Sequence, residues 1–175
     1  MVVIFGETWY HHFEQAYNEA QLPNEITKKG TWTERTLSIL ERMGKNLGYS
    51  VSKEKPHRMD MSWFDKKHFE PQVAIEYETE KTGILDSEIL NLAASSAYLK
   101  VFITYIEEKE IDLFLKEITE RWQTRSKRIW NDELLMIFCI YTVERGKRLF
   151  QYYIGYLLYF SKGNLQTKEL KQILC

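Results

Sequence analysis

Two stretches decide the fold: VAIEYETE at residues 73–80 and RMDMSWF at residues 58–64. In each, apolar and polar residues alternate, which is the pattern of a β-strand whose two faces meet different surroundings. Glu76 and Glu78 leave one face of the later strand, and its larger apolar residues leave the other. Asp60 stands in the middle of the earlier, otherwise hydrophobic strand. The pattern therefore predicts two neighbouring strands that carry three carboxylates.

Further elements follow outward from these strands. Helical spacing of apolar residues predicts helices, and β-branched and aromatic composition predicts strands. In chain order we expect helices at 8–20 and 33–48, strands at 49–53, 58–64 and 73–80, a helix at 86–98, a strand at 100–106, a helix at 111–129, and strands at 134–143 and 149–160. The polar last dozen residues predict a short helix or a loose tail. This order predicts an α/β fold with helices on the faces of one mixed central sheet.

Length and charge bound the function. The chain has 175 residues, 44% of them hydrophobic, with 24 basic residues against 25 acidic ones. This composition supports a real core, and the length predicts a single domain over 1–175. The formal net charge of −1 excludes a protein that coats nucleic acid by bulk positive charge. It leaves open a nucleic-acid enzyme whose charges are segregated along the chain.

The cysteines and apolar runs indicate the cellular setting. Cys139 and Cys175 form no disulfide framework and no metal-ligand spacing. No apolar run approaches the ~20 residues needed to span a bilayer, and the N-terminus lacks the pattern of a signal peptide. These features predict a cytoplasmic protein that does not interact with membranes.

The three carboxylates suggest a metal site. The Cα atoms of Glu76 and Glu78 are ~7 Å apart along a strand, where two full charges repel by ~2 kcal/mol at an effective dielectric of ~20. A bound cation relieves this repulsion, and convergent oxygen donors suit Mg²⁺. The alternative is that these acids only line the solvent face of a half-exposed strand. Against that alternative, the later strand is apolar enough to be central, and an unpartnered Asp60 inside a hydrophobic strand is unfavourable.

The same residues and element order resemble the PD-(D/E)xK nuclease superfamily, which has the restriction-endonuclease-like fold. The core of that fold has the order α-β-β-β-α-β, and the resemblance covers residues 33–106. Outside this core we expect an N-terminal helix at 8–20 and a C-terminal α-β-β extension at 110–160. The combination of short motifs with the order of the elements carries the resemblance.

The resemblance implies a role for each acidic residue. Asp60 matches the family's metal-binding Asp, Glu76 matches the acidic residue of the (D/E)xK motif, and Glu34 matches an acidic position on the first core helix. Glu78 stands where the family usually has Lys, a departure that a minority of restriction enzymes share. Glu34 is explained at least as well as a first-turn acid that the helix dipole favours.

The implied activity is Mg²⁺-dependent hydrolysis of phosphodiester bonds, with DNA expected before RNA and Mn²⁺ as a substitute metal. Asp60, Glu76 and the backbone carbonyl of Tyr77 would hold the ion, which activates a bound water and stabilises developing charge. Glu78 would act as the general base or orient the water, because a glutamate lacks the positive charge of a lysine.

Basic residues flank the acidic block. Residues 42–68 carry seven Lys or Arg against three acids, whereas residues 70–120 carry twelve acids against four bases. Within residues 42–68 we expect Lys53, Lys55 and Arg58 to contact phosphates, with solvated turns as the alternative explanation. The surplus aromatic residues toward the C-terminus are expected in the sheet core or at a homodimer interface, ahead of base stacking.

Two other functions stay open. A non-catalytic module that binds nucleic acid or protein would keep the nuclease-like fold, and Glu78 in place of Lys favours it. An unrelated α/β scaffold with an acidic sheet face would hold the carboxyl groups of Asp60 and Glu76 more than roughly 8 Å apart. Metal-dependent cleavage separates the enzyme from the binding module.

Overall fold

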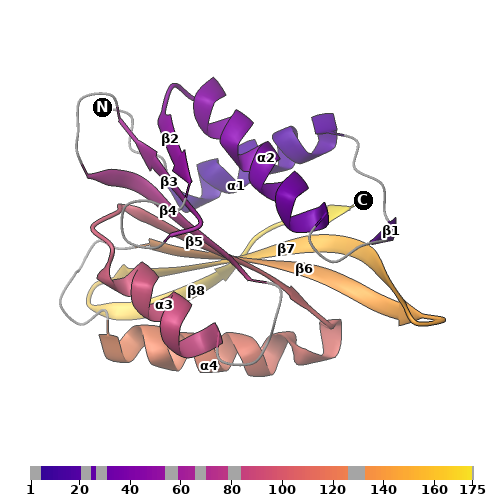
Figure 1. Cartoon of the computed structure of the whole chain (residues 1–175). Coiled ribbons are helices and arrows are strands. Elements are labelled where there is room, and N and C mark those ends of the chain that lie inside the picture. The colour runs from indigo at the N-terminus through magenta and orange to yellow at the C-terminus, as the bar shows by residue number, and fades with distance from the viewer. Residues whose placement is uncertain are drawn as a thin grey trace.

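The structure, a computed structural model, describes residues 5–20, 25–26, 31–53, 59–65, 70–78, 84–125 and 133–174. Within these ranges the chain forms a mixed α/β fold (Figure 1). Its elements are, in chain order, α1 (Gly6–Ala20), β1 (Glu25–Ile26), α2 (Thr31–Asn46), β2 (Ser50–Lys53), β3 (Met61–Phe64), β4 (Pro71–Glu78), α3 (Ile84–Ala94), β5 (Leu99–Ile106), η1 (Glu108–Glu110), α4 (Ile111–Arg125), β6 (Glu133–Glu144), β7 (Lys147–Ser161), β8 (Asn164–Glu169) and β9 (Ile173–Leu174).

One mixed sheet runs through the molecule. Its strand order is β1–β7–β6–β5–β4–β3–β2, and β8 and β9 also pair with β7. The strands β2, β3 and β4 form an antiparallel meander, β4, β5 and β6 are parallel, and β7 returns antiparallel to β6. The helices α3 and α4 connect the parallel strands, because parallel neighbours need a crossover. The predicted α/β class with a mixed central sheet is confirmed.

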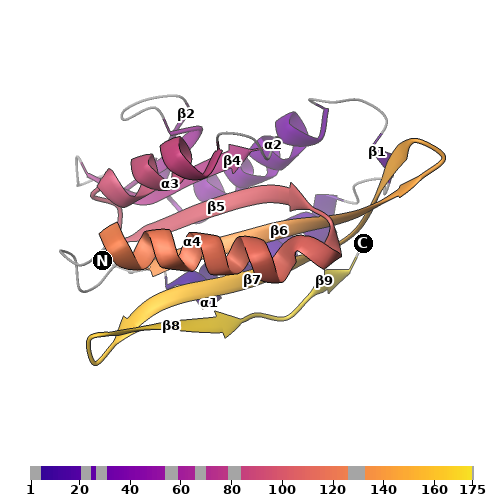
Figure 2. The same ribbon diagram turned by 90° about the horizontal axis from the view of Figure 1, so that it is seen from below.

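Helices cover both faces of this sheet and enclose two cores (Figures 1 and 2). On one face, α1 and α2 pack through large aromatic residues such as Trp9 and Phe13. On the other face, α3 and α4 pack through residues such as Ile89 and Trp122. Because side chains alternate along a strand, successive residues of β4 face different cores, as the sequence predicts.

The first helix is fixed to the sheet at its first turn. The backbone N–H of Gly6 donates a hydrogen bond to Glu133 Oε2 at 2.7 Å, which satisfies one of the unpaired N–H groups at a helix start. Farther along, the ring of Tyr10 lies against Gly155 of β7, where a Cβ atom would come within 2.8 Å of the ring. The helix starts slightly before the predicted range 8–20, where Glu133 caps it.

The prediction of a short helix or loose tail at the C-terminus is wrong. Lys162 and Gly163 have positive φ angles of 50° and 82°, the conformation of a two-residue hairpin turn. The chain then returns as β8, which pairs with β7 beginning at Ser161 opposite Asn164. The sequence does not predict this strand, because β8 is polar and mostly exposed and therefore lacks the alternation of apolar and polar residues that indicates a strand.

Two predicted elements differ at their ends. β3 begins at Met61, later than expected, so Asp60 lies in a bend before the strand. α3 ends at Ala94, earlier than expected, and Ser95 Oγ then accepts a hydrogen bond from the N–H of Ala97 at 3.2 Å. A serine that binds a nearby backbone N–H competes with helical bonding and favours a turn.

Some of the aromatic residues toward the C-terminus belong to the core, whereas Tyr152, Tyr159 and Phe160 are only partly buried. Trp122 and Tyr153 are fully buried, which agrees with the expected place of these two residues in the core. α4 is described as far as Arg125, and the rest of the helix predicted at 111–129 lies outside the described residues. None of the helices in the described ranges is long and apolar enough to cross a membrane.

Candidate active site

The register between β3 and β4 brings Asp60 and Glu76 together. Met61 pairs with Ile75 in this antiparallel ladder, so Asp60 comes opposite Glu76. The backbone nitrogen of Asp60 lies 3.4 Å from Glu76 Oε2 and donates a hydrogen bond to it. The two carboxyl groups are also close enough to share a hydrogen bond when one of them is protonated. The wide separation expected for an unrelated scaffold is not seen.

The backbone of Tyr77 ties Asp60 to β4. Its N–H donates a hydrogen bond to Asp60 Oδ2 at 2.7 Å, and this bond replaces a ladder bond because β3 begins only after Asp60. Within a strand, the N–H and the carbonyl of one residue point to the same edge. The carbonyl of Tyr77 therefore faces the edge of β4 on which Asp60 lies. The Tyr77 side chain lies on the opposite face and donates a hydrogen bond to the Tyr105 hydroxyl.

Glu76 is the buried acid of this site, with 4% of its surface exposed. Its Oε1 atom has no hydrogen-bond partner among the described residues. Burial, followed by the negative charge of Asp60, raises the pKa of Glu76 to about 8. Burial is also the main reason that the pKa of Asp60 is raised. Near neutral pH, Glu76 therefore keeps its proton when no cation is bound.

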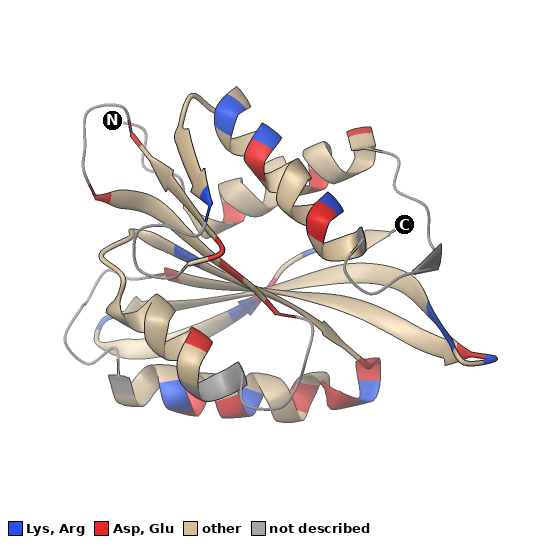
Figure 3. Cartoon of the chain, in the orientation of Figure 1, with Lys and Arg blue, Asp and Glu red and all other residues tan. Residues whose placement is uncertain are grey.

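Two further carboxylates act on this pair. Glu78 is half-buried at the end of β4, and its charge raises the pKa of Asp60. Glu88 lies on α3, and its charge raises the pKa of both Asp60 and Glu76. The Oε2 atom of Glu88 is buried and has no hydrogen-bond partner among the described residues. The site is thus a group of four carboxyls where β3, β4 and α3 meet, and Figure 3 shows acidic positions on both β4 and α3.

Glu88 is a site residue that sequence reasoning missed. Its helix is predicted, but a helix has several faces, and a single sequence does not say which face meets β4. The available signal is its spacing, because the buried Leu92 and Ser95 follow four and seven residues later. Residues at this spacing share one helical face. An acid on the same stripe as buried residues is the pattern that would have marked Glu88.

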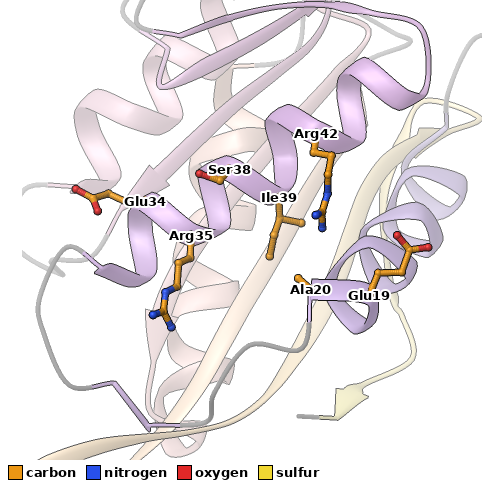
Figure 4. A pocket seen from close by; sticks show the side chains of 7 residues that line it. All are labelled: Glu19, Ala20, Glu34, Arg35, Ser38, Ile39 and Arg42. Carbon is orange, nitrogen blue, oxygen red and sulfur yellow. The ribbon is translucent and has the colours of Figure 1, made fainter.

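Glu34 lies on the other side of the sheet, in the first turn of α2. Its exposed side chain lines a pocket between α1 and α2 (Figure 4). Within the described parts of the chain, no hydrogen bond or ion pair joins Glu34 to Asp60 or Glu76. The structure therefore does not bring Glu34 into the carboxyl group. Its place in the first turn fits a favourable interaction with the helix dipole.

The basic residues predicted to contact phosphates are placed only in part. Lys55 and Arg58 lie outside the described residues. Lys53 is exposed at the end of β2 and pairs with Glu41 at 2.5 Å. Lys45 pairs with the same carboxylate at 2.5 Å, and the two ammonium groups lower the pKa of Glu41 to about 2. Lys53 is therefore engaged by an acid on α2.

A buried lysine lies on β5, the strand beside β4. Lys100 is fully buried on β5 and pairs in register with Ala74. Its ammonium group donates a hydrogen bond to the carbonyl of Ala97 at 2.9 Å, before the start of β5.

The donors present fit a hard divalent cation. All four are carboxyl groups, whose oxygens Mg²⁺ prefers, and the buried unpartnered oxygens of Glu76 and Glu88 are available acceptors within the described residues. As they stand, no three His, Cys, Asp or Glu side chains in the described ranges are arranged to hold an ion. Binding would therefore require these carboxyls to lose their shared proton and turn toward a common cation.

Sequence comparison places the chain in no family. No family model matches the chain, and no curated protein matches it in sequence. The geometry and chemistry of the site are therefore the basis for assigning a function.

Proposed function

We propose that the protein is a Mg²⁺-dependent nuclease of the PD-(D/E)xK type, with DNA as its expected substrate ahead of RNA. The buried pairing of Asp60 with Glu76, whose Oε1 lacks a partner among the described residues, is the observation that carries the proposal. A buried acceptor without a partner is unfavourable and calls for a functional explanation. Carboxyls whose pKa is raised by burial and by each other are typical of catalytic and metal sites.

The fold supports the same proposal. We infer that residues 31–106 form a restriction-endonuclease-like core. The order α2-β2-β3-β4-α3-β5, with an antiparallel meander followed by parallel β4 and β5, is the order of that core. Asp60 directly precedes the second strand of the meander, and Glu76 and Glu78 lie on the third, which are the positions of the family motif. The remaining helices and strands would be additions to the core.

Each residue of the site has a separate task in the proposed reaction. Asp60, Glu76 and the carbonyl of Tyr77 would hold Mg²⁺, and Glu88 would add a ligand from α3. When bound, the ion lowers the pKa of a coordinated water and neutralises charge on the phosphodiester. The Tyr77 N–H holds the Asp60 carboxylate in place. Glu78, half-buried near Asp60, would accept the proton of the attacking water as a general base.

A non-catalytic binding module is the second candidate function. The observation that favours it is Glu78 at the position where the family usually has Lys. In such a module the carboxyls would keep their shared proton, and a divalent metal would not bind. A metal that binds only the folded state stabilises it, so thermal unfolding with Mg²⁺, Mn²⁺ or EDTA separates the two candidates without a cleavage assay.

Cleavage of supercoiled plasmid and single-stranded DNA in Mg²⁺, Mn²⁺ or EDTA tests the proposed reaction. We expect metal-dependent cleavage by the wild type and a loss of ~1,000-fold in Asp60→Asn, because the ion loses a charged ligand. The matched control is Glu120→Gln on the exposed surface of α4, which should cleave normally. Cleavage that survives the double substitution D60N/E76Q contradicts the site. The absence of cleavage with either metal contradicts the enzyme.

A further inference from the structure

A pocket of about 450 Å³ opens between the C-terminal end of α1 and the outer side of α2 (Figure 4). Arg35, Ser38 and Arg42 of α2 line it, together with Ile39 and with Ala20 from α1. Ile39 is buried, whereas Ser38 and Arg42 are exposed. The pocket is therefore a groove with an apolar base and basic, hydrogen-bonding sides that are open to solvent.

The two arginines of this groove have no ion-pair partner among the described residues. Arg35 and Arg42 are seven residues apart, so they lie on one face of α2, ~10 Å apart along its axis. Neither guanidinium forms an ion pair with another described residue. By contrast, Lys45 on the same helix and Lys53 on β2 both pair with Glu41. The groove therefore presents two guanidinium groups that no acid among the described residues engages in an ion pair.

Two acids stand at the rim and limit what the groove can bind. Glu19 lies at the end of α1 and Glu34 in the first turn of α2. Figure 4 shows the Glu34 side chain directed away from both arginines. Neither acid pairs with an arginine of the groove within the described residues. They favour a ligand whose negative charges are discrete and localised at the two guanidinium groups.

We propose that this groove binds phosphate groups of a nucleic-acid strand through Arg35 and Arg42. Guanidinium groups match phosphate oxygens with paired hydrogen bonds, and the Ser38 hydroxyl adds a further donor. The ~10 Å spacing corresponds to about three nucleotides at a rise of ~3.4 Å each. The choice of nucleic acid rests on the proposed function. A free nucleotide or inorganic phosphate has the same phosphate chemistry, and the experiment separates these sources.

The helix that carries the groove also contacts the strand that carries the carboxyls. Thr33 and Thr36, which flank Arg35, lie beside the phenol of Tyr77. Tyr77 is the residue between the two glutamates of β4. The groove approaches the sheet from the face opposite the carboxyl group, so its arginines would bind the strand without touching the bond that is cut. Binding and cleavage are therefore separable.

The test measures binding by the full chain in EDTA, so that no strand is cut. Fluorescence anisotropy follows a labelled single strand of about 20 nucleotides, longer than one binding site, over a series of salt concentrations. In the double variant R35A/R42A we expect affinity to fall by about 10-fold or more, and the salt slope to fall by about 1.4, or ~0.7 for each lost contact. R35K/R42K should keep most of the slope, because it keeps the charge.

Arg121→Ala is the matched control, since Arg121 is paired with Glu117 at 2.9 Å on the far layer. It should bind within about two-fold of the wild type, as expected for a compensated surface charge. If R35A/R42A binds like R121A, or if the wild type binds no strand, the inference is overturned. Competition by inorganic phosphate or a nucleoside monophosphate as effective per phosphate as the strand would likewise overturn a polymer site.

The outcomes also distinguish this inference from the proposed nuclease. D60N/E76Q should lose cleavage and keep binding in EDTA, because its substitutions lie on the other face of the sheet. Loss of binding in R35A/R42A without metal-dependent cleavage by the wild type supports the groove and contradicts the nuclease. Metal-dependent cleavage by the wild type with unchanged binding in R35A/R42A supports the nuclease and contradicts the groove.

Discussion

The two faces of the sheet differ in the kind of polar group that they leave unpaired. On the face covered by α1 and α2, the buried atoms without a partner among the described residues are neutral, such as Trp9 Nε1 and Tyr153 Oη. On the face covered by α3 and α4, they include the carboxyl oxygens Glu76 Oε1 and Glu88 Oε2. Burying an unpaired neutral group is modestly unfavourable, whereas a buried charge needs a proton or a counterion. The first face is suited to packing, whereas the buried carboxyl groups of the second face must be neutralised by a proton or a cation.

The largest expected effect is a difference in cleavage rate between substitutions at two neighbouring residues of β4. Glu76→Gln should reduce metal-dependent cleavage by ~1,000-fold, about 4 kcal/mol, because a neutral amide is a poor ligand for Mg²⁺. Tyr77→Phe should cleave like the wild type, because it keeps the backbone groups that face Asp60 and changes only the other face. Initial cleavage rates of both variants at equal folded fraction check this. Equal losses in the two variants would contradict the division between the faces.

The packing face should respond to a cavity. Trp9 is fully buried and lies against Phe13 and Trp63, with ring centroids 5.8 and 5.6 Å away. Trp9→Ala should lower the free energy of unfolding by about 3–5 kcal/mol through lost burial and a residual cavity. Urea denaturation measures the loss. At a temperature where the variant is folded, Mg²⁺ should stabilise it as much as it stabilises the wild type. Loss of this stabilisation would mean that the two faces do not act independently.

The carboxyl face should make stability depend on pH. The pKa of Glu76 is raised from 4.5 to about 8 in the folded protein, so the folded state binds more protons than the unfolded state between these values. Its stabilising contribution is complete below about pH 4.5 and is lost as the pH rises through about 8, by up to about 1.4 kcal/mol per pH unit. The raised pKa of Asp60 acts in the same direction.

Denaturation curves between pH 5 and about 9 check this dependence. Glu76→Gln should flatten it, because the amide does not titrate. Added Mg²⁺ should reduce the loss of stability at the upper end, because a cation takes the place of the proton. A wild type whose stability rises over this range would contradict a buried, proton-sharing pair.

The part of the site that the sequence predicts is the part that depends on the alternation of residues along a strand. A period of two fixes that Glu76 and Glu78 share a face, and an antiparallel neighbour can then place Asp60 opposite Glu76. Alternation does not say which helix covers that face, so Glu88 escapes prediction. The bend at Asp60 is not predicted either. There the Asp60 side chain accepts the hydrogen bond from the Tyr77 N–H in place of a backbone group, and no sequence pattern encodes this replacement.

The same limit explains the rest of the fold. β4 and β5 are buried along almost their whole length and are readily predicted from apolar and β-branched residues. β8 is held by its hydrogen-bond ladder with β7 and has few apolar side chains, so the turn at Lys162 and Gly163 is the only sequence signal that indicates it. The basic residues are a further case: composition places charge near Lys53, but it does not predict that Lys53 pairs with Glu41 while Arg35 has no ion pair among the described residues.

The smallest expected effect is a loss of stability that does not depend on pH, because it concerns a hydrogen bond between two uncharged tyrosines. Tyr105→Phe removes the hydroxyl that accepts the hydrogen bond from the Tyr77 phenol in the aromatic core. The unfolding free energy should fall by about 1–2 kcal/mol, because a buried donor loses its partner. Between pH 5 and about 9 the loss should be constant, since the pKa of both tyrosines is raised above its ordinary value of 10.0 by burial. A loss that varies across this range would mean that the two faces of β4 are electrostatically coupled through the sheet.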